Sequence, residues 1–117
     1  MIKIKAHELF EIKDSLERLS DEQEKFTLNI GYHLLLMLKQ LETIEEYVFG
    51  RLFLVVDETR FNGSCMTDEE TEICNALFES EIEITPFTIK REDLFSSVNV
   101  ELPMEDIRNI DRLFEEN

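Results

Sequence analysis

The sequence has no tryptophan and only three glycines, two prolines, two cysteines and two histidines. Its glycines stand at positions 31, 50 and 63, so none of them belongs to a glycine-rich loop that could cradle a phosphate. No serine has the flanking glycines of a nucleophile elbow. The sequence therefore lacks the most recognisable signatures of nucleotide-binding enzymes and of serine hydrolases.

Metal and redox sites also lack a convincing pattern. Neither His7 nor His33 belongs to a spacing that makes a zinc site persuasive. Cys65 and Cys74 are nine positions apart and do not form a C-x-x-C pair, so we expect free, reduced thiols. We predict no metal, no cofactor and no enzymatic activity.

Basic residues are scarce, and this shortage sets the charge of the chain. Twelve Lys and Arg stand against 27 Asp and Glu, which gives a net charge of −15. Residues 1–60 hold 12 acidic and 8 basic side chains, whereas residues 61–117 hold 15 and 4. Such a field repels nucleic-acid phosphates and anionic lipid, so we expect no direct binding to nucleic acid or membrane. It attracts a protein with a basic surface, unless the acidity serves solubility alone.

Long hydrophobic runs are missing too. Even Leu34–Leu38, among the longest apolar runs in the middle of the chain, is far shorter than the ~20 residues that span a bilayer. The opening Met1-Ile2-Lys3-Ile4-Lys5 offers no hydrophobic leader. With 117 residues, of which 43% are apolar, the chain suits one globular domain over residues 1–117. We expect this domain in the cytoplasm.

Apolar periodicity predicts a helical first half. Ile2 and Ile4 alternate with lysines and indicate a short strand. A helix over about 6–19 follows, and a second helix is predicted from about Leu28 to Asp57. The buried face of the first helix is expected to be Leu9, Ile12, Leu16 and Leu19. The stripe of the second helix is expected to be Ile30, Leu34, Leu38, Leu41, Ile44, Val48, Leu52 and Val55.

The second helix carries more apolar surface than a small body needs, especially around 34–38 and 52–56. The surplus predicts contact with a partner or with a second copy of the chain, which would make a homo-oligomer. The side chains expected at such contacts are Leu35, Leu36, Met37, Phe49, Phe53 and Leu54. Packing inside the chain's own core is the alternative for the same residues.

The second half mixes short helices and strands. Thr67 and Glu70 have capping-box spacing and predict the start of a helix whose buried side is Ile73, Leu77 and Phe78. Strict alternation predicts a strand over 81–84, and Val98, Val100 and Leu102 predict another. Pro103 suits the first turn of a final helix with Ile107, Ile110 and Phe114 facing inward.

The predicted order is therefore β-α-α-α-β-β-α. It describes an α+β fold in which a helical body with one long central helix packs beside a small antiparallel sheet.

This layout resembles a family of small uncharacterised proteins of tailed phages and prophages of Gram-positive bacteria. The resembling features are the opening strand Met1-Ile2-Lys3-Ile4-Lys5, a first helix ending near Leu19, and a long central helix rich in Leu and Glu. An acidic turn, Glu81-Ile82-Glu83-Ile84 and a final helix ending Phe114-Glu115-Glu116 complete the pattern. The resemblance implies a phage origin and a bacterial host cell, and it carries no known activity or site residues.

Two binding roles follow. The first is an inhibitor that presents a negative surface to a host or defence protein whose normal ligand is nucleic acid. Its expected partner-binding face is acidic and consists of Asp68, Glu69, Glu70, Glu72, Glu79, Glu81 and Glu83. The alternative is an assembly or accessory component of a phage particle that acts through helix–helix contacts. A remote alternative is a Mg²⁺-dependent nucleotide hydrolase with Glu42, Glu45, Glu46, Glu11 and Asp14 as helical carboxylates.

Overall fold

A computed structural model describes residues 1–22, 26–57, 66–97 and 102–115, in which helices pack beside one small antiparallel sheet. The predicted α+β class with one long central helix is confirmed. The elements in chain order are β1 (Ile2–Lys5), α1 (Ala6–Ser20), α2 (Leu28–Phe53), α4 (Asp68–Phe78), β2 (Glu81–Ile84), α5 (Arg91–Ser97) and α6 (Met104–Asp111).

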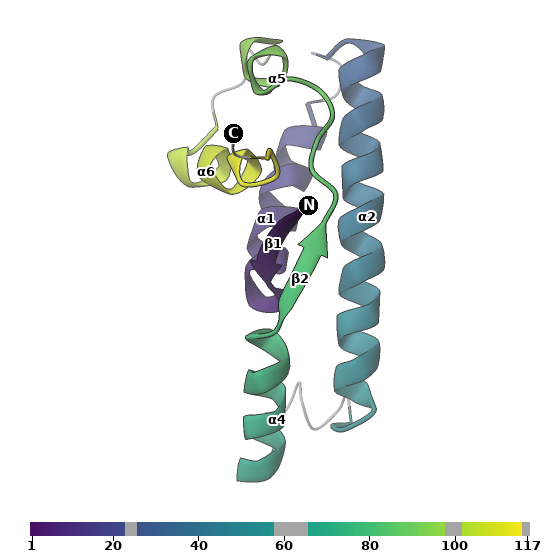
Figure 1. Cartoon of the computed structure of the whole chain (residues 1–117), viewed down its shortest axis with the longest axis vertical. Helices are drawn as coiled ribbons and strands as arrows, with labels where there is room; N and C mark the ends of the chain where they lie inside the picture. Colours follow the sequence, from purple (N-terminus) through teal and green to yellow (C-terminus); the bar gives the residue numbers. More distant parts are fainter. Residues whose placement is uncertain (23–25, 58–65, 98–101, 116–117) are drawn as a thin grey trace.

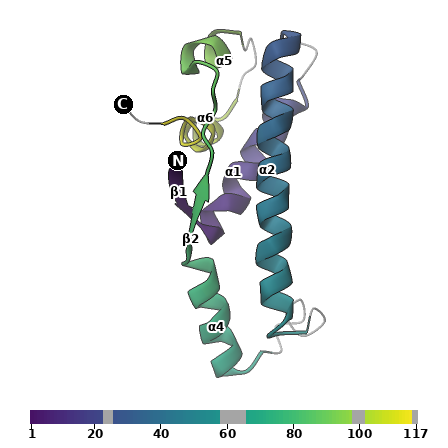
Figure 2. The ribbon, with the colours of Figure 1, turned by 45° about the vertical axis from the view of Figure 1, so that its right-hand side comes forward.

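The long helix α2 is the spine of the fold, and other elements line up along it (Figure 1). Its 26 residues extend ~39 Å at 1.5 Å per residue, against a longest molecular extent of 48 Å. Thr27 begins it, because the Thr27 hydroxyl accepts a hydrogen bond of 3.3 Å from the Ile30 amide. Helix α1 lies beside the first half of α2, and α4 lies beside the second half (Figure 1, Figure 2).

The predicted end of α2 needs a correction. The helix ends at Phe53, not at Asp57, and Leu54 and Val55 turn away from its axis. Val55, which was placed in the buried stripe, is 43% exposed, whereas Val56 is fully buried. The amides of Val55 and Val56 both donate to the Leu52 carbonyl and close this turn. The turn places Val56 in the core instead of Val55.

The main core lies between α1, the first half of α2 and the C-terminal segment. The predicted buried face of α1 is confirmed, since all four of its members are completely buried: Leu9, Ile12, Leu16 and Leu19. Leu34 and Leu41 face them from α2. Ile110 of α6 and the following Leu113 close the other side of α1.

A second core cluster lies at the far end of α2. Leu52 and Val56 pack there with Cys74 of α4, and the rings of Phe49 and Phe78 flank them. Phe10 of α1 also packs against this cluster, because its ring centroid is 5.3 Å from that of Phe49 and 6.0 Å from that of Phe78.

One residue predicted on the buried side of α4 is in fact exposed. Ile73 is 42% exposed, and Cys74 takes the buried position next to Leu77 and Phe78. These three residues share one face at spacings of three and four, and that face meets α2. Burial raises the pKa of the Cys74 thiol, whose sulfur lies 3.8 Å from the Met66 sulfur. Cys65 lies outside the described residues.

The sheet is a two-stranded antiparallel ribbon of β1 and β2. Ile2 pairs with Ile84 and Ile4 with Ile82, so one face of the ribbon is apolar and turns toward the core. At the end of β2, the Gln40 side chain of α2 bonds to Thr85 twice. It accepts from the Thr85 amide at 2.8 Å and donates to the Thr85 carbonyl at 3.1 Å.

The segment after β2 differs from the prediction. Helix α5 occupies Arg91–Ser97 and buries Leu94 completely, although no helix was predicted there. The strand expected over Val98–Leu102 falls largely on residues 98–101, which lie outside the described residues, and Leu102 itself is not in a strand. Helix α6 begins directly after Pro103 as expected, with Ile110 buried.

Candidate functional site

The residues predicted to form an acidic face lie on α4, the turn after it and β2, but their surroundings differ. Asp68, Glu69 and Glu72 are exposed in the first turns of α4, at one end of the molecule (Figure 1). Glu70 is partly buried and closes the capping box: its carboxylate accepts from the Thr67 amide at 3.1 Å, and its amide donates to the Thr67 hydroxyl at 3.2 Å. This part of the predicted face is a genuine concentration of exposed carboxylates.

The remaining three members of that face lie next to cations. The Glu79 carboxylate forms an ion pair with the Lys5 ammonium at 2.8 Å, and its other oxygen lies 3.6 Å from Nε2 of His7. The hydrogen bond from Lys5 lowers the pKa of the Glu79 carboxyl and raises the pKa of Lys5. Glu81 and Glu83 stand directly across the ribbon from Lys5 and Lys3. The sheet end of the predicted face is therefore close to charge balance.

The six predicted oligomer contacts also separate into two groups. Met37 is 4% exposed and belongs to the main core, and Phe49 and Phe53 stack on each other beside the second cluster at a centroid distance of 5.8 Å. Packing within the chain accounts for all three. Leu35, Leu36 and Leu54 are 50%, 45% and 82% exposed and remain available to a partner.

Exposed apolar side chains gather on the first half of α2. Leu28, Tyr32 and Leu35 are 92%, 56% and 50% exposed, and their spacings of four and three put them on one outward face. Leu36 flanks them at 45% exposure. Single exposed hydrophobes are ordinary, but four within nine positions of one helix form a patch.

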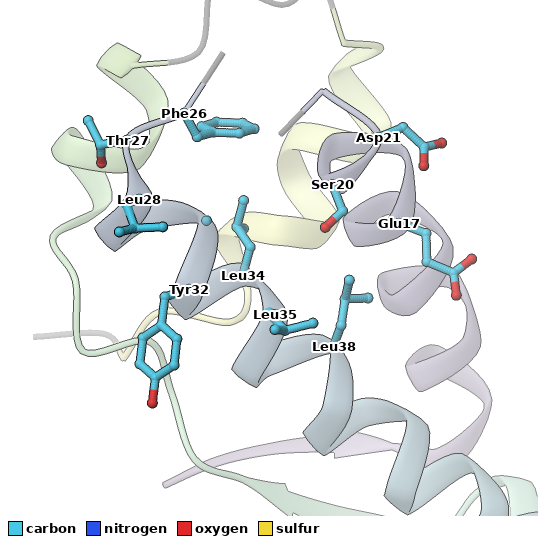
Figure 3. Close-up of a pocket in the computed structure, with 11 residues that line it drawn as sticks. Glu17, Ser20, Asp21, Phe26, Thr27, Leu28, Tyr32, Leu34, Leu35 and Leu38 are labelled. Carbon is cyan, nitrogen blue, oxygen red and sulfur yellow. The ribbon is translucent and has the colours of Figure 1, made fainter. Parts of the chain in front are cut away.

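A groove of about 820 Å³ opens beside this patch, between the end of α1 and the start of α2 (Figure 3). Phe26, Leu34 and Leu38 supply apolar surface inside it, and Leu35 leans toward Leu38, which is three positions further along the helix. Gly31 also lines it, and the space where a Cβ would stand is open for 4 Å. The missing side chain leaves the groove wider at that turn.

The α1 side of the groove is acidic. Glu17, Ser20 and Asp21 line it there, and Figure 3 shows their side chains along the last turns of α1. Among the described lining residues, Glu17 and Asp21 are the charged ones, and both are exposed. Lys13 lies one turn before Glu17 and bonds to it at 3.3 Å, but Lys13 also binds Glu45 at 3.2 Å. The groove thus combines an apolar floor with a carboxylate rim.

The sequence predicted this site only in part. The apolar excess at 34–38 was recognised, but Leu28, Tyr32 and the rim on α1 were not. A signal for the first two was present, because Leu28, Tyr32 and Leu35 repeat at helical spacing on the side opposite the buried stripe. No signal in the sequence could show that Glu17 and Asp21 lie across from them.

The carboxylates of the alternative magnesium site lie along α1 and α2. Glu45 is engaged by Lys13, whereas Glu42 and Glu46 are exposed on α2, and Glu11 and Asp14 are exposed on α1. Within the described ranges, no three or more His, Cys, Asp or Glu side chains come together in a way that could hold a metal ion.

Two further findings concern membrane spans and similarity to known proteins. None of the helices in the described part of the chain is both long enough and apolar enough to cross a membrane. No protein-family model, no curated protein and no solved structure matches the chain.

Proposed function

We propose that this protein acts by stoichiometric binding of another protein that has a basic surface, and that it catalyses no reaction. The observation that carries the proposal is the groove between α1 and α2, with its apolar floor and its rim of Glu17 and Asp21. Burial of apolar side chains at the centre of an interface supplies most of the affinity. Carboxylates at the rim, in a chain of net charge −15, speed the encounter with a cationic partner.

Inhibition is the specific role we favour. A protein that normally binds nucleic acid already has the basic surface that this chain attracts. Asp68, Glu69 and Glu72 extend the negative field at the start of α4. The phage origin implied by the resemblance, and a site of action in the cytoplasm of the bacterial host, belong to the same proposal.

A phage-particle assembly or accessory role is the second candidate. The exposed apolar side chains of Leu28, Leu35 and Leu36 favour it, because helix–helix contacts in an assembly need such a surface. The two roles differ in their dependence on α4. Charge reversal of Asp68, Glu69 and Glu72 to Lys should slow association with the basic partner of the inhibitory complex and leave assembly contacts intact.

The proposal is tested by affinity capture from a lysate of the bacterial host, followed by mass spectrometry. We expect one basic protein to be retained in near-equal molar amount at about 50 mM NaCl and largely lost at about 500 mM, where the Debye length is shorter. Retention of no protein at low salt would contradict the proposal. So would Mg²⁺-dependent nucleotide hydrolysis by the purified chain that disappears in Glu42→Gln.

A further inference from the structure

We infer that the groove between α1 and α2 receives one amphipathic, basic α-helix of the partner protein. This inference rests on the proposed function and names the element that the partner supplies. The two walls of the groove are α1 and α2, which lie side by side and are joined by the short connection between Ser20 and Leu28 (Figure 3). A third helix lying between two neighbouring helices places its side chains between theirs, which is how amphipathic helices are bound in hydrophobic grooves.

The dimensions suit a short helix. The groove follows α2 from Leu28 to Leu38, a rise of ~15 Å, which is the length of about three helical turns. The outward ridge of Leu28, Tyr32 and Leu35 repeats at four and three positions, so apolar side chains at i, i+3 or i+4, and i+7 of the partner would meet it. The exposed Lys39, one turn after Leu35, ends the apolar series.

The rim determines the charge of the occupant. Glu17 and Asp21 are exposed on the α1 wall, and the described lining residues include no Lys, Arg or His. Lys13, which does not line the groove, pairs with Glu17 at 3.3 Å but is shared with Glu45 at 3.2 Å, so this wall stays negative. A helix with its apolar face toward α2 would hold its flanking residues against this wall. Lys or Arg at those flanking positions pairs with the two carboxylates, whereas Asp or Glu there would be repelled.

A second copy of this chain is a poorer occupant on the same grounds. Two copies that joined through this groove would bring Glu17 and Asp21 of both chains to one interface, in molecules that each carry a charge of −15. Like charges at an interface weigh against association.

The test uses a designed 18-residue peptide with Leu along one helical face and Lys or Arg on the other. Its binding is measured by fluorescence anisotropy at low salt, and its position by amide chemical-shift changes in the labelled full chain. We expect a micromolar Kd and chemical-shift changes confined to the last turns of α1 and to residues 26–38. A scrambled peptide of the same composition, which keeps the charge but has no apolar face, should bind at least about tenfold more weakly.

Matched variants locate the site. Leu35→Asp should weaken binding of the amphipathic peptide by about tenfold or more, because it puts a carboxylate into the apolar ridge. Leu54→Asp is the control, since Leu54 is even more exposed but lies beyond the C-terminal end of α2. The double charge reversal Glu17→Lys with Asp21→Lys should weaken binding of the basic peptide. It should strengthen binding of a counterpart peptide in which every Lys and Arg is replaced by Glu. Circular dichroism confirms that each variant is folded.

Three results would overturn the inference. Equal binding of the scrambled peptide, or shifts centred on α4, would mean that charge alone attracts the peptide. Dimerisation of the free protein in light scattering, abolished by Leu35→Asp, would make a second copy the occupant. Capture of a basic protein that Leu35→Asp and the double reversal leave unchanged would reject the groove while the proposed binding function still stood.

Discussion

Asp106 is a buried carboxylate with two hydrogen-bonding partners, Ser15 and Arg18, and it joins α6 to α1. Its side chain is 3% exposed and accepts hydrogen bonds of 2.8 Å from the Ser15 hydroxyl and 2.8 Å from Arg18 Nε. Asn109 donates to the same Ser15 oxygen at 3.0 Å. The hydrogen bond from Arg18 holds the pKa of Asp106 below its usual value, with a smaller contribution from Ser15. The charge is therefore tolerated because each oxygen has a donor.

Replacement of this carboxylate should lower stability in a pH-dependent way. Asp106→Asn keeps an acceptor for Ser15 but loses the charge that Arg18 binds, and we expect a free energy of unfolding about 1–2 kcal/mol lower at pH 7. The half-exposed Arg18 limits the loss, because solvent screens its charge. Urea unfolding of the wild type and of Asp106→Asn measures this difference, and Glu11→Gln, a substitution of an exposed residue, is the control. Equal stability of Asp106→Asn and wild type at pH 7 would contradict the structure.

The sign of the pH dependence follows from the lowered pKa. A carboxyl whose folded pKa lies below its unfolded value, about 3.9, stabilises the fold above that value and loses the contribution as pH falls through the folded pKa. The difference between wild type and Asp106→Asn should thus be constant above about pH 5 and shrink below about pH 4. A difference that grew on acidification would show that the carboxyl is not stabilised in the folded state.

At the scale of the elements, α4 depends on its first turn. Thr67 and Glu70 exchange two hydrogen bonds that satisfy amides at the helix start, and the Thr71 amide closes the first turn on the Thr67 carbonyl. Thr67→Ala should destabilise α4 by about 1 kcal/mol, whereas Thr67→Ser keeps the hydroxyl and should cost little. Hydrogen exchange at the Glu70 and Thr71 amides measures this. Equal exchange in the two variants would rule out a role for the cap.

A side chain of α2, Gln40, holds the backbone at the end of β2. Gln40 mimics a neighbouring strand, because its amide group makes both the donor and the acceptor bond with the Thr85 backbone. Gln40→Ala should lower the free energy of unfolding by about 1 kcal/mol and speed exchange of the Thr85 amide. Gln40→Glu retains the acceptor alone and should be intermediate at pH 7. Unchanged exchange at Thr85 would show that β2 is held by β1 alone.

At the scale of the whole molecule, repulsion among carboxylates opposes folding. The chain carries −15 in a body with extents of 48 × 29 × 23 Å, and half-exposed ion pairs such as Lys5 with Glu79 contribute little. Added NaCl screens the net repulsion more than it weakens those pairs. We expect about 0.5 M NaCl to raise the melting temperature by on the order of 5 °C, which corresponds to about 1 kcal/mol. A melting temperature that fell with salt would mean that the ion pairs dominate.

Local patterns in the sequence determined several elements because their causes lie within a few residues. Ile2 and Ile4 alternate with lysines and form β1, and Thr67 with Glu70 starts α4. The α1 stripe from Leu9 to Leu19 is buried as its spacing predicts. The shortage of basic residues and of glycine-rich loops likewise needs no structure to be read. Each of these depends on period, capping or composition alone.

Tertiary contacts decided what those patterns leave open. Leu35 and Met37 are both apolar members of one helix, yet two positions correspond to a rotation of ~200°, so Met37 is buried while Leu35 is exposed. Glu81 and Glu83 stand across from lysines because β1, nearly eighty positions earlier, pairs with β2.

The candidate binding site is one of the features that only tertiary contacts determine. Glu17 and Asp21 of α1 line the same groove as the apolar side chains of α2 because the chain reverses direction between two helices that pack side by side. The charge and the apolar surplus are properties of the sequence. Their meeting in one groove depends on distance in space, which only packing of the helices establishes.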